Sequence, residues 1–128
     1  MVGNKKKKII ILDDDKFLVN MYAMKFDNKG IEVITVSSGE ELIKKLKDGE
    51  RADLLLLDII VPGLSGTEAL KQIKKEKLAE GVKIVMLSNQ SAQEEIEKAK
   101  ALKIDGYIVK AMATPSEVVE KVLAIMNS

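Results

Sequence analysis

Five short runs of apolar and β-branched residues, spaced along the chain, are the feature that most constrains its fold. Within these runs the apolar residues are largely continuous and do not alternate with polar ones. Continuous runs indicate strands that are covered on both faces, as in parallel sheets. The predicted strands are residues 9–12, 32–36, 54–57, 83–87 and 107–109.

Amphipathic segments between these runs predict helices. Asp15 can cap a first helix that ends near Lys29, where Gly30 follows. Each of the next four helices is predicted to begin with a capping box, a serine or threonine followed three residues later by glutamate. The four pairs are Ser38 with Glu41, Ser65 with Glu68, Ser91 with Glu94, and Thr114 with Glu117. Five strand–helix units with right-handed crossovers form an α/β, doubly wound parallel sheet with helices on both faces.

Composition narrows the class of protein. The chain has 128 residues, enough for one domain, with 46% hydrophobic and 32% charged residues. It contains no cysteine and no histidine, which excludes disulfides, histidine metal sites and Ser-His-Asp catalysis. The net charge of +1 predicts no attraction to nucleic acid, and no apolar run is long enough for a membrane span or a signal peptide. We interpret the basic residues 1–7 as a solvated arm and not as a binding patch.

Polar side chains follow four of the predicted strands. Residues 13–15 are three aspartates after the first strand, Asp58 follows the third, Ser88 the fourth and Lys110 the fifth. A parallel sheet brings the carboxyl ends of its strands to one edge, where ligands bind near a topological switch point. We therefore expect these groups to converge, although Asp15 alone can be a helix cap and Asp58 alone a turn residue.

The expected chemistry follows from the crowded carboxylates. Like charges repel, and a divalent cation relieves the repulsion. Oxygen ligands suit Mg²⁺ or Mn²⁺ better than zinc. A carboxylate beside such a metal can attack a phosphoryl donor and form an acyl phosphate. Lys110 and Ser88 can then interact with the phosphoryl oxygens.

Four motifs together resemble the response-regulator receiver family. They are IIILDDD, LLLLDIIVPGLSG, IVMLSN and GYIVK, and the resemblance runs from about Lys8 to Met126. The resemblance implies a flavodoxin-like (βα)5 fold with strand order 2-1-3-4-5. It also implies a single receiver domain over residues 1–128.

The resemblance further implies a metal site. Asp13 and Asp14 match the acidic pair that holds Mg²⁺ or Mn²⁺, with Asp14 favoured as the direct ligand. Asp58 matches the phosphoacceptor and a further ligand, and the backbone carbonyl of Ile60 would complete the set.

Three other positions match residues that handle the phosphoryl group. Lys110 matches the phosphate-binding lysine, Ser88 the switch hydroxyl, and Tyr107 the aromatic residue that turns inward on activation. From the residue alone, Tyr107 would be a tyrosine at the edge of the core. Phosphorylation would shift a pre-existing equilibrium and remodel the face made by helix 4, strand 5 and helix 5.

The implied function is a phosphorylation-dependent signalling switch. The donor would be a histidine kinase or phosphotransfer protein, and the output a contact with a downstream protein target. The protein would be no conventional enzyme: it would catalyse only its own phosphorylation and slow autodephosphorylation. We expect a cytoplasmic monomer or weak homodimer without nucleic-acid or membrane partners.

Three positions depart from the family pattern. Val61 stands where methionine is common, Asn89 where a small residue is usual, and Ala111 where the family has a proline in a cis peptide. Because a cis bond before a non-proline residue costs about 2.5–4 kcal/mol, we expect the Lys110–Ala111 peptide to be trans.

Two other readings stay open from the sequence. The first is a receiver-like binding module that acts without phosphorylation. The second is a haloacid-dehalogenase-like phosphatase with Asp13 as nucleophile and Asp15 as acid/base. That family usually has threonine or valine where this chain has Phe17, and its members are longer than 128 residues.

Overall fold

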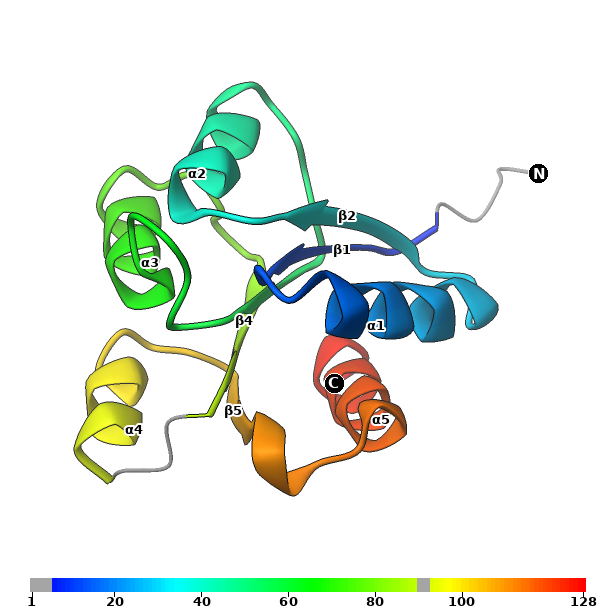
Figure 1. Cartoon of the computed structure of the whole chain (residues 1–128). Coiled ribbons are helices and arrows are strands. Elements are labelled where there is room, and N and C mark those ends of the chain that lie inside the picture. Colours follow the sequence, from blue (N-terminus) through cyan, green and yellow to red (C-terminus); the bar gives the residue numbers. More distant parts are fainter. Residues whose placement is uncertain (1–5, 90–92) are drawn as a thin grey trace.

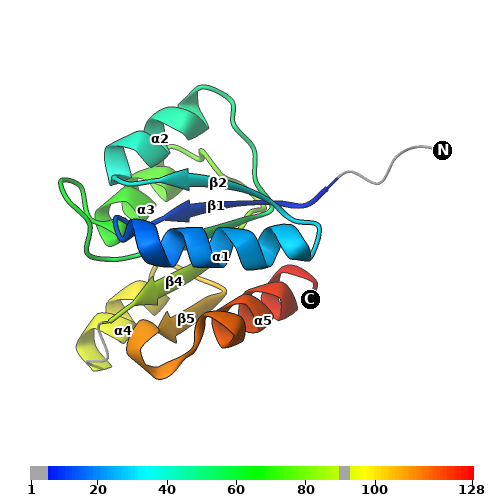
Figure 2. The same cartoon turned by 45° about the vertical axis from the view of Figure 1, so that its right-hand side comes forward.

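The computed structural model describes residues 6–89 and 93–128, in which a five-stranded sheet lies between two layers of helices (Figures 1 and 2). All neighbouring strands are parallel, and their order is β2-β1-β3-β4-β5, which confirms the predicted fold class and strand order. In chain order the elements are β1 (Lys8–Leu12), α1 (Lys16–Asn28), β2 (Glu32–Val36), α2 (Gly39–Lys47), β3 (Leu54–Leu57), α3 (Gly66–Lys75), β4 (Lys83–Ser88), α4 (Gln93–Lys100), β5 (Gly106–Val109), the 3-10 turn η1 (Lys110–Met112) and α5 (Pro115–Met126).

The sheet has a hydrophobic core on each face. Side chains of β1 alternate between the two cores: Ile9 and Ile11 face α1 and α5, whereas Ile10 and Leu12 face the side of α2 and α3. All four residues of β3 are fully buried. This double coverage explains why the central strands β1, β3 and β4 are apolar over most of their length.

Most predicted helix starts are confirmed. The Asp15 carboxylate accepts a hydrogen bond from the backbone N–H of Leu18, and α1 ends at Asn28, just before Gly30 with its positive φ of 78°. Complete capping boxes begin α3 at Ser65 and α5 at Thr114. The predicted box of Ser91 with Glu94 lies outside the described residues.

The predicted capping box of α2 is only half right. The Ser38 hydroxyl accepts from the Glu41 N–H at 3.1 Å, as expected. The Glu41 carboxylate, however, accepts from the backbone N–H of Ser37 at 2.9 Å and not from that of Ser38. The glutamate thus satisfies the donor one residue further out, a choice that the S-x-x-E pattern does not specify.

The segment after β5 forms a short 3-10 turn, Lys110–Met112, before Thr114 caps α5. No cis peptide bond occurs among the described residues, so the predicted trans Lys110–Ala111 bond is confirmed. Within the described ranges, no helix is long and apolar enough to cross a membrane.

Candidate functional site

Backbone hydrogen bonds place Asp13 and Asp58 side by side at the carboxyl edge of the sheet. The Asp13 N–H donates to the Val36 carbonyl at 3.1 Å, and the Asp58 N–H donates to the Leu12 carbonyl at 2.9 Å. Both aspartates therefore extend their strands by one residue. They lie at the ends of the adjacent strands β1 and β3, whose connections run in opposite directions, to β2 and to β4. This is the topological switch point of the sheet.

Three carboxylates gather at this point. Asp13, Asp14 and Asp58 each offer an oxygen, and these oxygens lie within 4.8 Å of one another. Asp13 and Asp58 are buried, whereas Asp14 is exposed. The Oδ1 atom of Asp13 accepts from the Asp15 N–H at 2.9 Å, and the Oδ1 atom of Asp58 accepts from the Ile60 N–H at 3.3 Å. Each buried carboxylate thus has one oxygen held by the backbone and a second oxygen available to the site.

Lys110 reaches these second oxygens from the end of β5, two strands from Asp58 on β3 and three from Asp13 on β1. Its ammonium lies 2.7 Å from Oδ2 of Asp13 and 3.0 Å from Oδ2 of Asp58. The second contact is a hydrogen bond, whereas the first is an ion pair without hydrogen-bond geometry. In the described part of the chain, no donor forms a hydrogen bond to the buried Oδ2 of Asp13.

This arrangement fits a divalent cation. One lysine faces three carboxylates, which leaves a formal charge of −2 if all are ionised. A single ammonium contacts one oxygen of each of two carboxylates and cannot balance all three. A second cation would relieve the remaining repulsion among them. Carboxylate and carbonyl oxygens are the ligands that Mg²⁺ prefers. Asp13, Asp14 and Asp58 can therefore hold the metal predicted from the sequence.

Burial shifts the proton equilibria at this edge. Loss of solvent raises the pKa of Asp58, and the hydrogen bond from Lys110 opposes but does not cancel this effect. Burial alone would lower the pKa of Lys110, but the Asp13 and Asp58 carboxylates outweigh it and raise the pKa. Burial also raises the pKa of Tyr22, a core residue of α1 whose electrostatic environment includes Lys110. Sequence patterning did not single out Tyr22, because its position within α1 resembles that of any core residue.

The remaining predicted residues lie around this cluster. Ser88 is almost completely buried as the last residue of β4, beside Val109 in the register of β4 and β5. Tyr107 is half-buried in β5 and packs against the core on the α2 and α3 side. The Ile60 side chain is exposed, two residues beyond Asp58. The roles predicted for Ser88 and Tyr107 in switching, and for the Ile60 carbonyl as a metal ligand, stay predictions.

Gly66 is a site residue that the sequence analysis noted only as part of a motif. A Cβ atom at this position would lie 1.9 Å from the carbonyl oxygen of Asp58, too close for any side chain. The Gly66 N–H also donates to the Ile59 carbonyl at 2.8 Å. The segment after Asp58 therefore folds back tightly on the strand end, and only glycine permits that approach.

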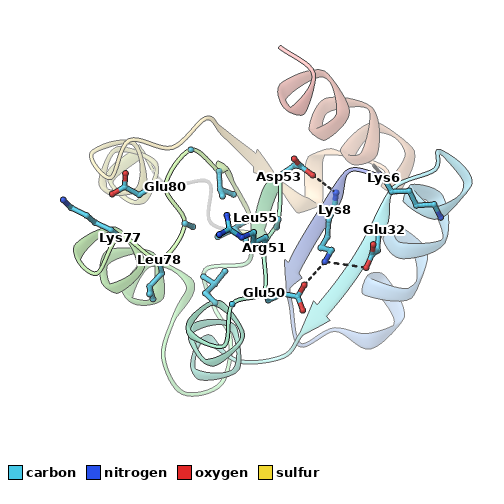
Figure 3. Close-up of a pocket in the computed structure, with 16 residues that line it drawn as sticks. Lys6, Lys8, Glu32, Glu50, Arg51, Asp53, Leu55, Lys77, Leu78 and Glu80 are labelled. Atoms are coloured by element: carbon cyan, nitrogen blue, oxygen red, sulfur yellow. Dashed lines mark hydrogen bonds and ion pairs between the residues drawn. The ribbon is translucent and has the colours of Figure 1, made fainter. Parts of the chain in front are cut away.

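A hollow lies at the opposite edge of the sheet. It has a volume of about 880 Å³ and is lined by the starts of the strands and the α3–β4 connection (Figure 3). Lys8 occupies one side of it, with Glu32 and Glu50 next to its ammonium. The candidate site is thus a charged sheet edge that is separate from this hollow.

Comparison with known proteins agrees with this geometry. The profile of the response regulator receiver domain matches residues 9–123. The alkaline phosphatase synthesis transcriptional regulatory protein PhoP of Bacillus subtilis is 37% identical over 123 residues, which are 94% of this chain and 49% of that protein. The phosphate regulon transcriptional regulatory protein PhoB of Rhizobium meliloti is 30% identical over 120 residues, 94% of this chain and 52% of that protein.

Solved structures give the same result. A CheY-like response regulator receiver domain protein from Methanospirillum hungatei superposes with a TM-score of 0.85 at 28% identity, covering 96% of this chain and 95% of that one. The phosphorylated cyanobacterial phytochrome response regulator RcpA gives 0.82 at 29% identity, covering 94% and 91%.

The fold and the acidic sheet edge define a receiver domain of two-component signalling. The chain belongs to the response regulator receiver family. Receiver domains bind Mg²⁺ at a cluster of acidic residues, interact with histidine kinases and downstream effectors, and act as phosphorylation switches. The chain spans about half the length of the curated relatives it matches.

Proposed function

We propose that this chain is a phosphorylation-dependent switch that accepts a phosphoryl group on Asp58 with the help of Mg²⁺. Asp13, Asp14, Asp58 and the Ile60 carbonyl would hold the metal. The bound metal would neutralise charge on the phosphoryl group during transfer.

The observation that carries the proposal is the position of Lys110. Its ammonium contacts Oδ2 of both Asp13 and Asp58, so it lies at the oxygen that would attack the phosphorus. On phosphorylation, Lys110 can keep its contact with Asp13 and form a new one with a phosphoryl oxygen. Ser88, at the end of the neighbouring strand, would donate a hydrogen bond to another oxygen.

Exposed apolar residues near the site support a protein as phosphodonor. Phe17, Ile60 and Met112 are three of the four large apolar side chains that are strongly exposed in the described structure. They follow the ends of β1, β3 and β5, respectively, within a few residues of the reactive groups. Apolar residues around a charged centre are typical of protein contacts. We infer that a histidine kinase or phosphotransfer protein docks here.

The output would be a change in the α4-β5-α5 face. Among the described side chains of α4, only Ala99 is buried, so this helix can move at little cost in packing. Tyr107, half-buried in β5, would turn inward when Ser88 moves toward the phosphoryl group. A downstream protein would then bind the altered face. Cytoplasmic location and a monomeric or weakly dimeric state stay predictions.

Intact-mass measurement after incubation with acetyl phosphate and Mg²⁺, followed by peptide mapping, tests the proposal. We expect one phosphoryl group on Asp58, gained only with Mg²⁺ or Mn²⁺, and no gain in Asp58→Asn. Phosphorylation of Asp13, or an undiminished gain in Asp58→Asn, would contradict the assignment. A wild-type protein that gains nothing from any donor would favour the alternative of a binding module that acts without phosphorylation.

A further inference from the structure

The first turn of α2 contacts the loop that follows Asp58. The Glu40 carboxylate accepts the backbone N–H of Leu64 with both oxygens, at 3.3 Å and 3.2 Å. The two residues are 24 positions apart, and among the described residues no other side-chain hydrogen bond links α2 to this loop. Glu40 therefore links the loop between β3 and α3 to helix α2.

Two glycines make this contact unusually close. A Cβ atom at Gly39 would lie 2.5 Å from the carbonyl oxygen of Leu64. A Cβ atom at Gly63, whose φ is +75°, would lie 2.8 Å from both carboxylate oxygens of Glu40. At Gly39 the helix therefore meets the loop backbone with no room for a side chain, whereas at Gly63 the close atoms are the carboxylate end of Glu40.

The same loop is also fixed at its two ends. It begins at Asp58, whose N–H bonds to β1, and it ends at Gly66, which approaches the Asp58 carbonyl. Between these ends lies Ile60, whose N–H donates to the Asp58 carboxylate. The Glu40–Leu64 hydrogen bond is then a further contact that holds the loop, six residues after the reactive Asp58.

We propose that Glu40 is a positioning residue for the metal site. By holding Leu64, it fixes the loop that carries Asp58 and the Ile60 carbonyl in the geometry that the cation requires. The inference rests on the proposed function, because it takes Asp58 and Ile60 as ligands. Its physical basis is preorganisation: ligands held in place before binding lose less freedom when the metal binds.

The test compares Glu40→Ala and Glu40→Gln with the matched control Glu41→Ala. Glu41 lies in the same turn of α2 and carries the same charge, but its carboxylate accepts from Ser37 and not from the loop. Mg²⁺ affinity is measured by calorimetric titration without phosphodonor, and backbone exchange at Leu64 by nuclear magnetic resonance. Phosphorylation by acetyl phosphate is followed at low and at saturating Mg²⁺.

We expect Glu40→Ala to speed exchange at Leu64 and to weaken Mg²⁺ binding about three- to tenfold, the scale of one hydrogen bond. Phosphorylation should slow by a similar factor at low Mg²⁺ and recover at saturation. Glu40→Gln, which keeps an acceptor, should restore most of the affinity, and Glu41→Ala should resemble wild type.

Other outcomes overturn the inference. Faster exchange at Leu64 with unchanged Mg²⁺ affinity would show that Glu40 holds the loop without positioning the site. An equal loss of affinity in Glu41→Ala would assign the effect to helix charge. If Mg²⁺ binding depends on Glu40 but the wild-type protein accepts no phosphoryl group, the proposed function alone is contradicted. If the wild-type protein binds no Mg²⁺, both the proposed function and this inference are contradicted.

Discussion

Both edges of the sheet place one lysine among three carboxylates, and the two clusters behave differently. At the amino edge, Lys8 lies 2.7 Å from Glu50 and 3.7 Å from Glu32, and its backbone N–H donates to Asp53 at 2.8 Å (Figure 3). At the carboxyl edge, Lys110 contacts Asp13 and Asp58 at similar distances, with Asp14 nearby. In each cluster a lysine ammonium lies 2.7 Å from one carboxylate and further from a second, so another property must distinguish the clusters.

That property is burial. The side chains of Lys8 and Glu50 are 25% and 30% exposed, whereas those of Lys110 and Asp13 are 11% and 1% exposed. At the amino edge the hydrogen bond from Lys8 lowers the pKa of Glu50. At the carboxyl edge burial prevails over the hydrogen bond from Lys110 and raises the pKa of Asp58. The lysine–carboxylate ion pairs at the amino edge are therefore partly screened by water. Those at the carboxyl edge are shielded from water, so the excess negative charge there favours a further cation.

The largest difference is expected when each lysine loses its charge. Lys110→Met leaves two buried carboxylates without their cation and should lower the free energy of unfolding by about 3 kcal/mol in Mg²⁺-free buffer. Lys8→Met, at the exposed edge, should cost only about 0–1 kcal/mol. Urea denaturation measures both. Lys110→Met should also lose most phosphorylation, and equal costs for the two variants would show that burial is not what separates the clusters.

Magnesium should stabilise only the carboxyl edge. At ten times its dissociation constant, a ligand that binds only the folded state adds about 1.4 kcal/mol. Thermal denaturation with and without Mg²⁺ should therefore show a higher midpoint for wild type and for Glu32→Ala, which alters the amino edge. Asp14→Ala should lose most of this increase, and it should impair phosphorylation through lower metal affinity. If the Mg²⁺-dependent rise in midpoint is retained in Asp14→Ala but lost in Glu32→Ala, the metal binds at the amino edge and the prediction is wrong.

A smaller effect concerns the lifetime of the phosphoryl group. Ile60 is exposed and apolar beside Asp58, so it can shield the phosphorus and offers no hydrogen bond to an attacking water. Ile60→Asn should speed loss of the phosphoryl group several-fold, which corresponds to less than about 1.4 kcal/mol in the barrier. Time courses of intact mass for wild type and variant give the two rates. The family resemblance implies that Gln90, two residues after Ser88, also flanks the attacking water, but Gln90 lies outside the described residues.

The smallest effect is expected at the amino edge, in the wall of the hollow. Lys77 follows α3 with a φ of 55°, a left-handed conformation that glycine adopts more readily. Lys77→Gly removes this strain but makes the unfolded chain more flexible, so a net stabilisation of only about 0.5 kcal/mol is expected. Denaturation midpoints measure it. Phosphorylation should be unchanged, and a changed rate would connect the amino edge to the reaction.

Local chemistry determined much of this fold in advance. The β3 boundaries follow from an apolar run that suits a strand buried on both faces, and the β2 boundaries follow from a β-branched run. The starts of α3 and α5 follow from side chains that bond to backbone three residues away. These signals lie within a few residues, so the sequence carries them directly. The convergence of Asp13, Asp58 and Lys110 could also be predicted, because a parallel sheet aligns the carboxyl ends of its strands.

Tertiary structure decided how these groups interact. Only packing shows that Asp13 is buried while Asp14 is exposed, although the two are identical neighbours in the sequence. Only packing brings Glu40 to Leu64 and forces glycine at position 66. Burial and close approach depend on the whole surroundings of a residue, which are assembled from distant segments. The sequence by itself therefore determined which groups meet, and the folded chain determined which of them water can no longer screen.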